Sequence, residues 1–289
     1  MTTQQLYNDF LHKLNRVYEA REAVNITDWI LENVSGLKRF ERNINTDFNL
    51  SNEQKSLLNK YLVELMNHKP VQYVLNEAWF YKMKFYVNEH VLIPRPETEE
   101  LVQWIVEDVR SKIYEIQNKE LEILDIGTGS GCIPISLKKE IENLRITAVD
   151  ISEDALKVAN KNARALHTEI NFIQLNFLDE RFWNKLRHYD IIVSNPPYIA
   201  ESEKKELAEN VAAFEPAIAL FVPDSSPFIF YEKIAKFAQS HLDIDGHVYV
   251  EIHENYSKEI KQIFSAYSFD IEIKKDIYGK NRMIRAFKL

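Results

Sequence analysis

The sequence predicts an α/β fold in which a small N-terminal helical bundle precedes a mainly parallel sheet with an antiparallel hairpin at its C-terminal edge. Three observations predict it: helical apolar stripes before residue 70, alternating strand and helix patterns from residue 121, and two C-terminal strand patterns joined by a turn. Strict alternation implies a parallel sheet covered by helices. We therefore expect a helical domain at residues 1–75, a linking β-hairpin at 76–93 and an α/β domain at 94–289.

The first 70 residues contain three stripes of apolar side chains at three- and four-residue spacing, as on one side of a helix. The stripes are Leu6, Phe10, Leu14 and Val17; Ile26, Trp29, Ile30 and Val34; and Leu57, Leu58, Tyr61, Leu62 and Leu65. Ser51 and Gln54 form a candidate capping box before the third stripe. No pattern here indicates catalysis, so we interpret the region as a helical bundle whose functional role would be docking of a partner.

Residues 78–93 are rich in aromatic and β-branched side chains, which favour strands, so the linking hairpin is expected there. Pro94 and Pro96 follow, with one residue between them. Each proline fixes its own φ angle, and the residue before each proline favours an extended backbone. A helix is expected at residues 101–116. Pro94-Arg95-Pro96 is therefore expected to form a stiff segment, suited to be the wall of a pocket.

The expected α/β domain alternates between two patterns. Strands are expected at residues 121–126, 145–150, 170–175, 190–194 and 247–252, and helices at 133–141, 152–165 and 227–241. The last two strands, at 269–275 and 283–288, are joined by a turn and would add an antiparallel edge to the parallel sheet.

Composition limits the classes of function. The formal net charge is −8, which disfavours non-specific binding of polyanions, because that binding depends on Lys and Arg. The single cysteine, Cys132, excludes a disulfide within the chain and a cysteine-based zinc site, and we expect no metal. No apolar run approaches the roughly 18 residues that span a bilayer, and no signal segment is recognised. We expect a cytoplasmic protein with no membrane partner.

Three of the six glycines, Gly127, Gly129 and Gly131, lie in one loop between an expected strand and an expected helix. Glycine permits tight turns and close approach of a ligand to the backbone. Asp150 ends the next expected strand, where an acid can accept hydrogen bonds from both ribose hydroxyls of a nucleoside. Together these features indicate a Rossmann-like, nucleoside-binding domain.

The glycine spacing favours S-adenosylmethionine over a dinucleotide. A dinucleotide site usually has the spacing G-x-G-x-x-G, which seats a pyrophosphate at a helix N-terminus, whereas this loop has G-x-G-x-G. Asp125 precedes the loop, and its negative charge would favour the sulfonium and ammonium groups of S-adenosylmethionine. The candidate cofactor-binding residues are Asp125, Gly127, Thr128, Gly129, Ser130, Gly131, Asp150 and Ile151.

Ser194-Asn195-Pro196-Pro197-Tyr198 follows the expected strand at 190–194, at the sheet edge that faces the ligand crevice. Since proline has no N–H, the segment presents two acceptors, the Asn195 side-chain oxygen and the Pro196 carbonyl. Two acceptors at fixed angles can hold the two hydrogens of an –NH₂ group, and Tyr198 could stack on its plane. The segment therefore predicts methylation of a planar, amide-like nitrogen.

These motifs give the chain a resemblance to the HemK-type N5-glutamine methyltransferases, which modify class I peptide chain release factors. The similarity extends over nearly the whole chain. The residues that carry it are Pro70-Val71-Gln72-Tyr73, Ile93 through Glu99, Asp125 through Cys132, Ala148 through Ser152, Val193 through Ile199, and Phe214-Glu215-Pro216. The resemblance implies a Rossmann-like S-adenosylmethionine-dependent methyltransferase domain and class I release factors as the protein substrate.

The resemblance also implies roles for individual residues. Phe177 would pack on the adenine, and Asn195 would border both the cofactor and the substrate. The substrate amide would contact Asn195, Pro196, Pro197 and Tyr198, with Pro94 and Arg95 beside them, and the catalytic residues would be Asn195, Pro196 and Tyr198. Two positions depart from the family pattern: Asn176 stands where an acid is common, and residues 221–227 replace a more glycine-rich loop.

Two other functions share part of these patterns. A nucleic-acid amino-methyltransferase acting on adenine N6 or guanine N2 uses the same Asn-Pro-Pro-Tyr string, but it needs a positive groove and often flips its base. The acidic net charge and the lack of a Lys- and Arg-rich appended domain count against it, and no direct sequence-specific nucleic-acid binding is expected. A non-catalytic cofactor-binding assembly protein would have no need of Asn195.

Overall fold

The computed structural model describes residues 3–44, 49–113 and 120–288 and divides the chain into two compact units. The first unit comprises Met1–Glu77 with Ala208–Phe214, and the second comprises Ala78–Leu207 with Glu215–Leu289. The expected boundary at residue 75 lies close to this division. The segment at 208–214, expected within the α/β domain, groups instead with the helical unit.

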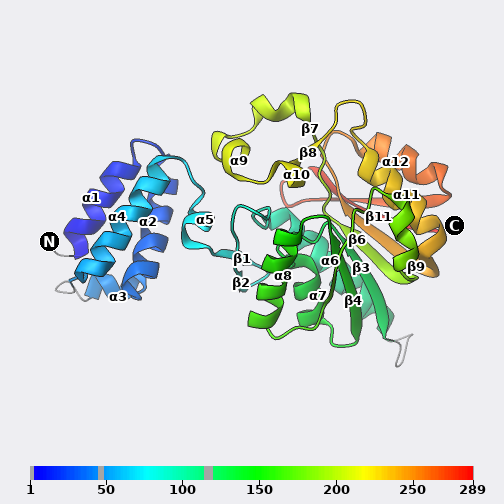
Figure 1. The fold of residues 1–289 in the computed structure, drawn as a ribbon, viewed down its shortest axis with the longest axis horizontal. Helices are drawn as coiled ribbons and strands as arrows, with labels where there is room; N and C mark the ends of the chain where they lie inside the picture. Colours follow the sequence, from blue (N-terminus) through cyan, green and yellow to red (C-terminus); the bar gives the residue numbers. More distant parts are fainter. Residues whose placement is uncertain (1–2, 45–48, 114–119, 289) are drawn as a thin grey trace. The chain divides into compact units, whose positions relative to one another are not determined.

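The first unit is helical, as its apolar stripes predict. Its helices are α1 (Thr3–Leu14), α2 (Ala20–Ser35), α3 (Arg39–Ile44), α4 (Asn52–Met66), α5 (Val71–Leu75) and α9 (Glu209–Phe214). Phe10, Leu14, Ile30 and Leu65 are among the residues of its core, to which α1, α2 and α4 all contribute (Figure 1). Leu57 differs from the rest of its stripe, because its side chain is exposed.

The capping box at the start of α4 is confirmed. The Ser51 hydroxyl accepts a hydrogen bond from Gln54 N at 3.2 Å, and Gln54 Oε1 accepts one from Ser51 N at 2.8 Å. Each residue thus satisfies a backbone N–H that the first turn of a helix leaves without an intrahelical partner.

A seven-stranded sheet organises the described part of the second unit, in the order β10-β11-β9-β6-β3-β4-β5. Its parallel strands are β3 (Leu121–Ile126), β4 (Leu144–Asp150), β5 (Asn171–Gln174), β6 (Tyr189–Ser194) and β9 (Leu242–Glu251). The C-terminal strands β10 (Phe269–Lys275) and β11 (Asn281–Lys288) pair antiparallel, and β11 joins β9. The predicted mainly parallel sheet with an antiparallel C-terminal hairpin is confirmed.

Helices pack on both faces of this sheet, as strands that are buried on both sides require. The helices are α6 (Pro96–Ile113), α7 (Cys132–Glu140), α8 (Glu153–Ala165), α11 (Ile229–His241) and α12 (Ser257–Ala266). Alternate residues of a strand point to opposite faces, so Ile123 packs with α6 and α7 whereas Leu124 packs with α11 and α12. Figure 1 shows these two groups of helices on either side of the strands.

The linking hairpin is shorter than expected. Its strands are β1 (Ala78–Phe80) and β2 (Met83–Phe85), and the chain from residue 86 to 93 has no strand pairing. The Asn162 side chain of α8 replaces a strand partner there, because it accepts from Tyr86 N at 2.7 Å and donates to Tyr86 O at 2.9 Å. The aromatic composition of 78–93 favoured strand and predicted a hairpin there, but a side chain from a distant helix satisfies the backbone at Tyr86.

Three other expectations need correction. The helix expected at 101–116 starts at Pro96, because proline suits the first helical position and Glu97 and Glu99 favour the first turn; residues 114–116 lie outside the described residues. Strand β9 starts at Leu242 rather than at residue 247. Helix α12 was not expected.

The loop at 221–227, which departs from the family pattern, contains a short strand. Strand β8 (Phe221–Val222) pairs in parallel with β7 (Ile199–Ala200), which directly follows Tyr198. The loop therefore ties down the chain that leaves the Asn-Pro-Pro-Tyr segment. A 3₁₀ turn at Glu201–Glu206, another at Glu180–Lys185 and the short α10 (Ala217–Leu220) complete the described elements.

Candidate active site

The candidate site residues follow the carboxyl ends of four neighbouring parallel strands. In the sheet register Ile126 of β3 lies opposite Val149 of β4 and Ser194 of β6, and Ser194 lies opposite Val250 of β9. The chain crosses to β4 on one side of β3 and to β6 on the other, so this is the point where strand order reverses. Open α/β sheets bind ligands in the crevice at such a point.

The glycine loop after β3 has a backbone that favours glycine. Gly127, Gly129 and Gly131 have φ angles of +74°, +53° and +78°, in the left-handed region. A Cβ on Gly127 or Gly129 would meet nothing within 4 Å, so the backbone there is open to a ligand. A Cβ on Gly131 would lie 3.2 Å from Ala159 Cβ, so this glycine lets α7 approach α8 closely.

Asp125 is a buried carboxylate without a partner. Neither of its oxygens has a hydrogen-bond partner among the described residues, and the buried Thr128 hydroxyl also lacks one. Burial raises the pKa of Asp125 to about 7; the nearby Thr128 hydroxyl lowers it, and the charge of Asp150 raises it. Buried polar groups in native proteins are normally satisfied, so these oxygens are suited to accept from a ligand that binds beside the glycine loop.

Asp150 is held against the same loop. Its Oδ2 accepts from Gly129 N and its Oδ1 from Ser152 N, each at 2.9 Å. These two bonds fix the carboxylate plane at the end of β4. Burial raises the pKa of Asp150, although the backbone hydrogen bonds lower it. Each carboxylate oxygen retains lone pairs for further donors, as a ribose diol requires.

These residues fit S-adenosylmethionine. An unpaired buried carboxylate suits its cationic groups, the open glycines suit its close approach, and the fixed Asp150 suits its ribose. Ile151, beside Asp150, is 44 % exposed and offers apolar surface. Ser130 is buried, and its carbonyl accepts from Asn162 Nδ2 at 2.9 Å, so Asn162 anchors both the glycine loop and the hairpin exit.

Phe177, which was expected to pack on the adenine, and Asn176, which departs from the family pattern, both make contacts within the protein. Phe177 is buried in the core, with its ring 5.6 Å from that of Trp183 and 5.3 Å from that of Phe237. Asn176 Oδ1 accepts from Leu178 N at 3.1 Å, which stabilises the local turn. Contact of Phe177 with adenine stays a prediction.

The Asn-Pro-Pro-Tyr segment is anchored at its first residues. Ser194 donates to Ile126 O at 2.7 Å and so ties β6 to β3 beside the glycine loop. Asn195 Nδ2 donates to Thr98 Oγ1 at 3.0 Å. With the amino group bound to Thr98, the Asn195 side-chain oxygen is an acceptor that the segment can offer to a ligand, together with the Pro196 carbonyl.

Tyr198 and Thr98 meet at one buried acid, Glu251, the last residue of β9. Thr98 donates to Glu251 Oε2 at 2.6 Å and Tyr198 donates to Oε1 at 3.3 Å. Burial raises the pKa of Glu251 to about 7, while the Thr98 hydrogen bond and the charge of Arg282 lower it. Burial and the Glu251 charge raise the pKa of Tyr198, so its phenol stays protonated and donates.

Arg95 forms an ion pair with the buried Glu215, whose other oxygen accepts from Ile93 N at 3.2 Å. The pair joins the Pro94–Pro96 segment to the residue after Phe214. Arg95 was expected to contact substrate; its guanidinium makes this ion pair, and contact with substrate stays a prediction. Its side chain is one-third exposed.

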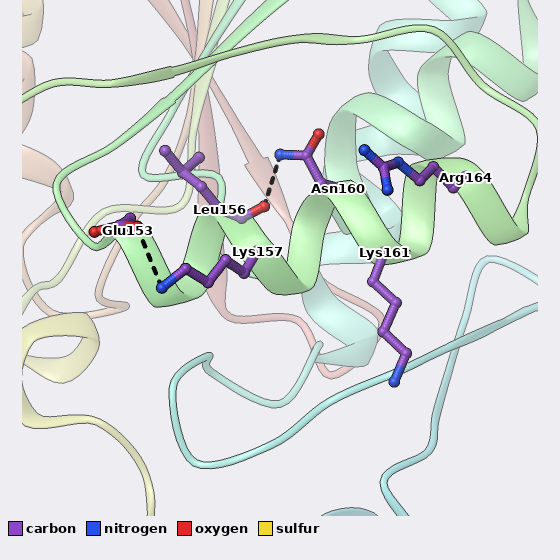
Figure 2. Close-up of a pocket in the computed structure, with 6 residues that line it drawn as sticks. All are labelled: Glu153, Leu156, Lys157, Asn160, Lys161 and Arg164. Atoms are coloured by element: carbon purple, nitrogen blue, oxygen red, sulfur yellow. Dashed lines mark hydrogen bonds and ion pairs between the residues drawn. The ribbon is translucent and has the colours of Figure 1, made fainter.

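A separate hollow on α8 lacks the features of a binding site. It is lined by Glu153, Leu156, Lys157, Asn160, Lys161 and Arg164, all from one helix (Figure 2). Lys157 pairs with Glu153, and Asn160 donates to Leu156 O, so these polar groups satisfy one another along the helix. Among the described residues, only those of α8 line it.

Sequence reasoning missed Thr98, Glu251 and Asn162. A signal for Glu251 was present, because an acid at the carboxyl end of an expected parallel strand faces the ligand crevice. Thr98 lay inside a motif already recognised, yet only the fold brings it to Asn195 and Glu251. The described residues contain no group of acids, histidines or cysteine arranged to hold a metal. None of the helices in the described ranges is long and apolar enough to cross a bilayer.

The chain is similar to known methyltransferases. Residues 108–218 match the family model of the methyltransferase small domain. The release factor glutamine methyltransferase of Flavobacterium psychrophilum is 42% identical and covers 99% of this chain and 99% of its own. The protein of that name from Bacteroides thetaiotaomicron is 36% identical and covers 94% of this chain and 95% of its own.

A solved structure, the protein-(glutamine-N5) methyltransferase (release factor-specific) of Alicyclobacillus acidocaldarius, is 26% identical and covers 71% of this chain and 100% of that one, with a TM-score of 0.42. The assignment rests on the sequence identity and its coverage rather than on this structural likeness. By that criterion, with the glycine loop, Asp150 and the Asn-Pro-Pro-Tyr segment in place, the chain belongs to the release factor glutamine methyltransferase family.

Proposed function

We propose that this protein transfers a methyl group to the side-chain amide nitrogen (N5) of the glutamine in the Gly-Gly-Gln loop of class I peptide chain release factors. The observation that carries the proposal is the orientation of Asn195. Its amino group is bound to Thr98, so its oxygen is left to accept a hydrogen from a substrate amide. Membership of the family supports the identity of the substrate.

Two hydrogen-bond acceptors make the amide nitrogen of the substrate more nucleophilic. An amide nitrogen is a weak nucleophile because its lone pair is delocalised into the carbonyl. The Asn195 side-chain oxygen and the Pro196 carbonyl hold its two hydrogens, which turns the lone pair toward the methyl donor. The ring of Tyr198 stacks on the amide plane and is fixed by its hydrogen bond to Glu251. No strong base is required, since an alkylated amide nitrogen is acidic and loses its proton readily.

S-adenosylmethionine supplies the electrophilic methyl group when it is bound. Asp125 would face its cationic groups, the open backbone of Gly127 through Gly131 would line it, and Asp150 would accept from its ribose. Asn195 would border both ligands, because β6 is the neighbour of β3 and Ser194 is bonded to Ile126.

The helical unit is proposed to bind the body of the release factor. It exposes large apolar side chains, among them Phe40 (61 %) and Val63 (62 %), which a protein partner could cover. A glutamine loop alone offers too little area for specific docking. Replacing Phe40 or Val63 by serine should therefore raise KM for the intact factor but leave KM for a short glutamine peptide unchanged.

A cytoplasmic location follows from this substrate and agrees with a single, unpaired cysteine. Nucleic acid is a poor alternative substrate on charge grounds, since the chain carries a net charge of −8. The Asn-Pro-Pro-Tyr chemistry by itself would serve an exocyclic base nitrogen equally well, so the experiment includes that class.

The test is methyl transfer from labelled S-adenosylmethionine to four substrates: an intact release factor, its loop Gln→Ala variant, duplex DNA and structured RNA. We expect label on the intact factor alone, and mass spectrometry should place one methyl on the loop glutamine. Undiminished label on the Gln→Ala variant, or label on nucleic acid, would overturn the proposal. A protein that binds the cofactor and labels none of the four would be a binding protein rather than this enzyme.

A further inference from the structure

Three segments far apart in the sequence meet in one hydrogen-bonded chain behind Asn195. Asn195 Nδ2 donates to Thr98 Oγ1 at 3.0 Å, and Thr98 Oγ1 donates to Glu251 Oε2 at 2.6 Å. Thr98 lies in the first turn of α6, Asn195 follows β6, and Glu251 ends β9. Thr98 and Glu251 are each 2 % exposed, so water does not compete for these bonds.

The hydroxyl of Thr98 decides which group donates and which accepts in this row of hydrogen bonds. A threonine hydroxyl has one hydrogen to donate and lone pairs with which to accept. The Glu251 carboxylate has no hydrogen, so it takes the one from Thr98. The Thr98 oxygen can then only accept, and an asparagine amide beside it must turn its amino group toward it.

This order of donors and acceptors decides which end of Asn195 faces the substrate. The two ends of an asparagine amide have nearly the same shape, so packing cannot distinguish them and only hydrogen bonds can. With the amino group held by Thr98, the oxygen lies at the other end of the amide plane. That oxygen is the group that the amide-holding mechanism requires.

We propose that Glu251 is a positioning residue that, through Thr98, sets the orientation of the Asn195 amide and so presents its oxygen to the substrate nitrogen. The proposal rests on the proposed function, in which Asn195 accepts a hydrogen from the glutamine amide. In this arrangement Glu251 acts on the Asn195 amide through a relay, the hydrogen bonds that join Glu251 to Thr98 and Thr98 to Asn195, and it separately accepts a hydrogen bond from Tyr198.

A proton on Glu251 reverses the relay. A protonated carboxyl can donate to Thr98, whose hydroxyl then donates to the Asn195 oxygen, and the amide turns its amino group toward the substrate. Two amino groups then face each other and the substrate is no longer held. Burial raises the pKa of Glu251 to about 7, which places this change within reach of a kinetic experiment.

Four elements or segments that pack against Glu251 place a titratable, charged or hydrogen-bonding group beside it. From α6 Thr98 donates to it and the charge of Glu97 raises its pKa; from the segment after β6 Tyr198 donates to it; from β11 the charge of Arg282 lowers its pKa. From α11 Tyr231 donates at 3.0 Å to the backbone carbonyl of Glu251 and not to its carboxylate.

Tyr231 therefore provides a matched control. Tyr231→Phe removes a buried hydrogen bond to the same residue but leaves the relay intact. The test compares Thr98→Val, which ends the relay, with Thr98→Ser, which keeps the hydroxyl, and with Glu251→Gln, which cannot gain a proton in this range. The measured quantities are kcat, KM for the intact release factor and Kd for S-adenosylmethionine, with kcat followed from about pH 6 to about pH 9 at saturating cofactor.

Thr98→Val should lower kcat by about 10- to 100-fold, as loss of a supporting partner behind a reacting group commonly does, while cofactor Kd stays within about twofold. Thr98→Ser should restore most of kcat, and Tyr231→Phe should leave it unchanged. Wild-type kcat should fall about tenfold per pH unit below the pKa of Glu251, and Glu251→Gln should lack this acid limb.

A full kcat in Thr98→Val, or an unchanged acid limb in Glu251→Gln, would overturn the proposal. Should Glu251→Gln fail to fold, the comparison of valine with serine at Thr98 still decides. Asn195→Ala separates this inference from the proposed function. If that variant is inactive while Thr98→Val is fully active, only the relay is wrong; if Asn195→Ala is fully active, the amide-holding mechanism fails first.

Discussion

The two halves of the active site are built in different ways. The proposed cofactor half, at the ends of β3 and β4, consists of one continuous glycine loop and two acids, Asp125 and Asp150, and its key contact is a backbone one, in which Gly129 N donates to Asp150. The amide half, after β6 and β9, is built from side chains of three distant segments that bind one another. Backbone placement tolerates change in most side chains, whereas a side-chain relay fails when one member is removed.

The largest effect is expected on the amide half. Asn195→Ala removes one preorganised acceptor at the reacting nitrogen and should lower kcat by about 10²- to 10³-fold, by analogy with deletion of one oxyanion-hole donor. Cofactor Kd should change little, because the glycine loop and Asp150 are untouched. Steady-state kinetics with an intact release factor, together with calorimetry, measures both quantities.

Asn160→Ala is the matched control, since Asn160 lies on α8 and its amide binds Leu156 O of the same helix. It should retain wild-type kcat. Near-normal turnover in Asn195→Ala would remove the distinction between the two halves.

The next largest effect is expected in the cofactor half, where Asp125 should make the free energy of unfolding depend on pH. Folded Asp125 keeps its proton up to about pH 7, whereas the unfolded carboxyl loses it near its ordinary pKa of 3.8. The folded state thus binds the extra proton, and the free energy of unfolding of the cofactor-free protein falls as pH rises between these values, by up to about 1.4 kcal/mol per pH unit for this group.

Asp125→Asn should flatten this slope and stabilise the cofactor-free protein near pH 8 relative to wild type. Part of the slope should remain, because burial raises the pKa of Glu251 as well. Urea unfolding of both proteins at about pH 5 and about pH 8 gives the comparison. Identical slopes would mean that Asp125 is ionised and partnered in the folded chain, contrary to its unsatisfied oxygens.

A smaller loss, confined to cofactor binding, is expected for Asp150→Ala. The variant loses charge-assisted hydrogen bonds to the ribose, each contributing about 1.5–3 kcal/mol before water compensates, so Kd for S-adenosylmethionine should rise about 10- to 100-fold. Asp154→Ala, on the exposed first turn of α8, is the control and should leave Kd unchanged. An Asp150→Ala variant that keeps wild-type affinity in calorimetry would place the ribose elsewhere.

Most of the fold could be predicted because its signals are local. The alternating patterns predicted β3, β4, β6 and the C-terminal hairpin to within about two residues at each end, since each strand carries its own apolar run. The errors lie where distant contacts decide. The expected strand beyond Phe85 is absent because Asn162, 76 residues away from Tyr86, binds that backbone instead.

The residues of the candidate site also differ in whether local sequence features or distant contacts determine their roles. The glycine loop and Asp150 could be recognised because glycine spacing and a strand end are local features. Thr98 and Glu251 could not be assigned roles, because their function depends on a contact across 153 residues of sequence. Arg95 shows the same limit: its contact with substrate stays a prediction, whereas its ion pair with Glu215, 120 residues away, could not be predicted from its motif.

The smallest effect tests whether the glycine loop is constrained by packing as well as by its backbone. Gly131 and Gly279 have nearly the same φ, +78° and +80°, so alanine at either position pays the left-handed strain of about 1–2 kcal/mol. Only at Gly131 would the new Cβ also press on neighbours, since Ala159 Cβ and Ile135 Cδ1 would each lie 3.2 Å away, whereas at Gly279 it meets nothing within 4 Å. Gly131→Ala should therefore destabilise the protein by about 1 kcal/mol more than Gly279→Ala in urea unfolding, because the packed α7–α8 contact must shift. Equal losses would show that α7 and α8 relax freely, and that φ alone dictates glycine at the end of the loop.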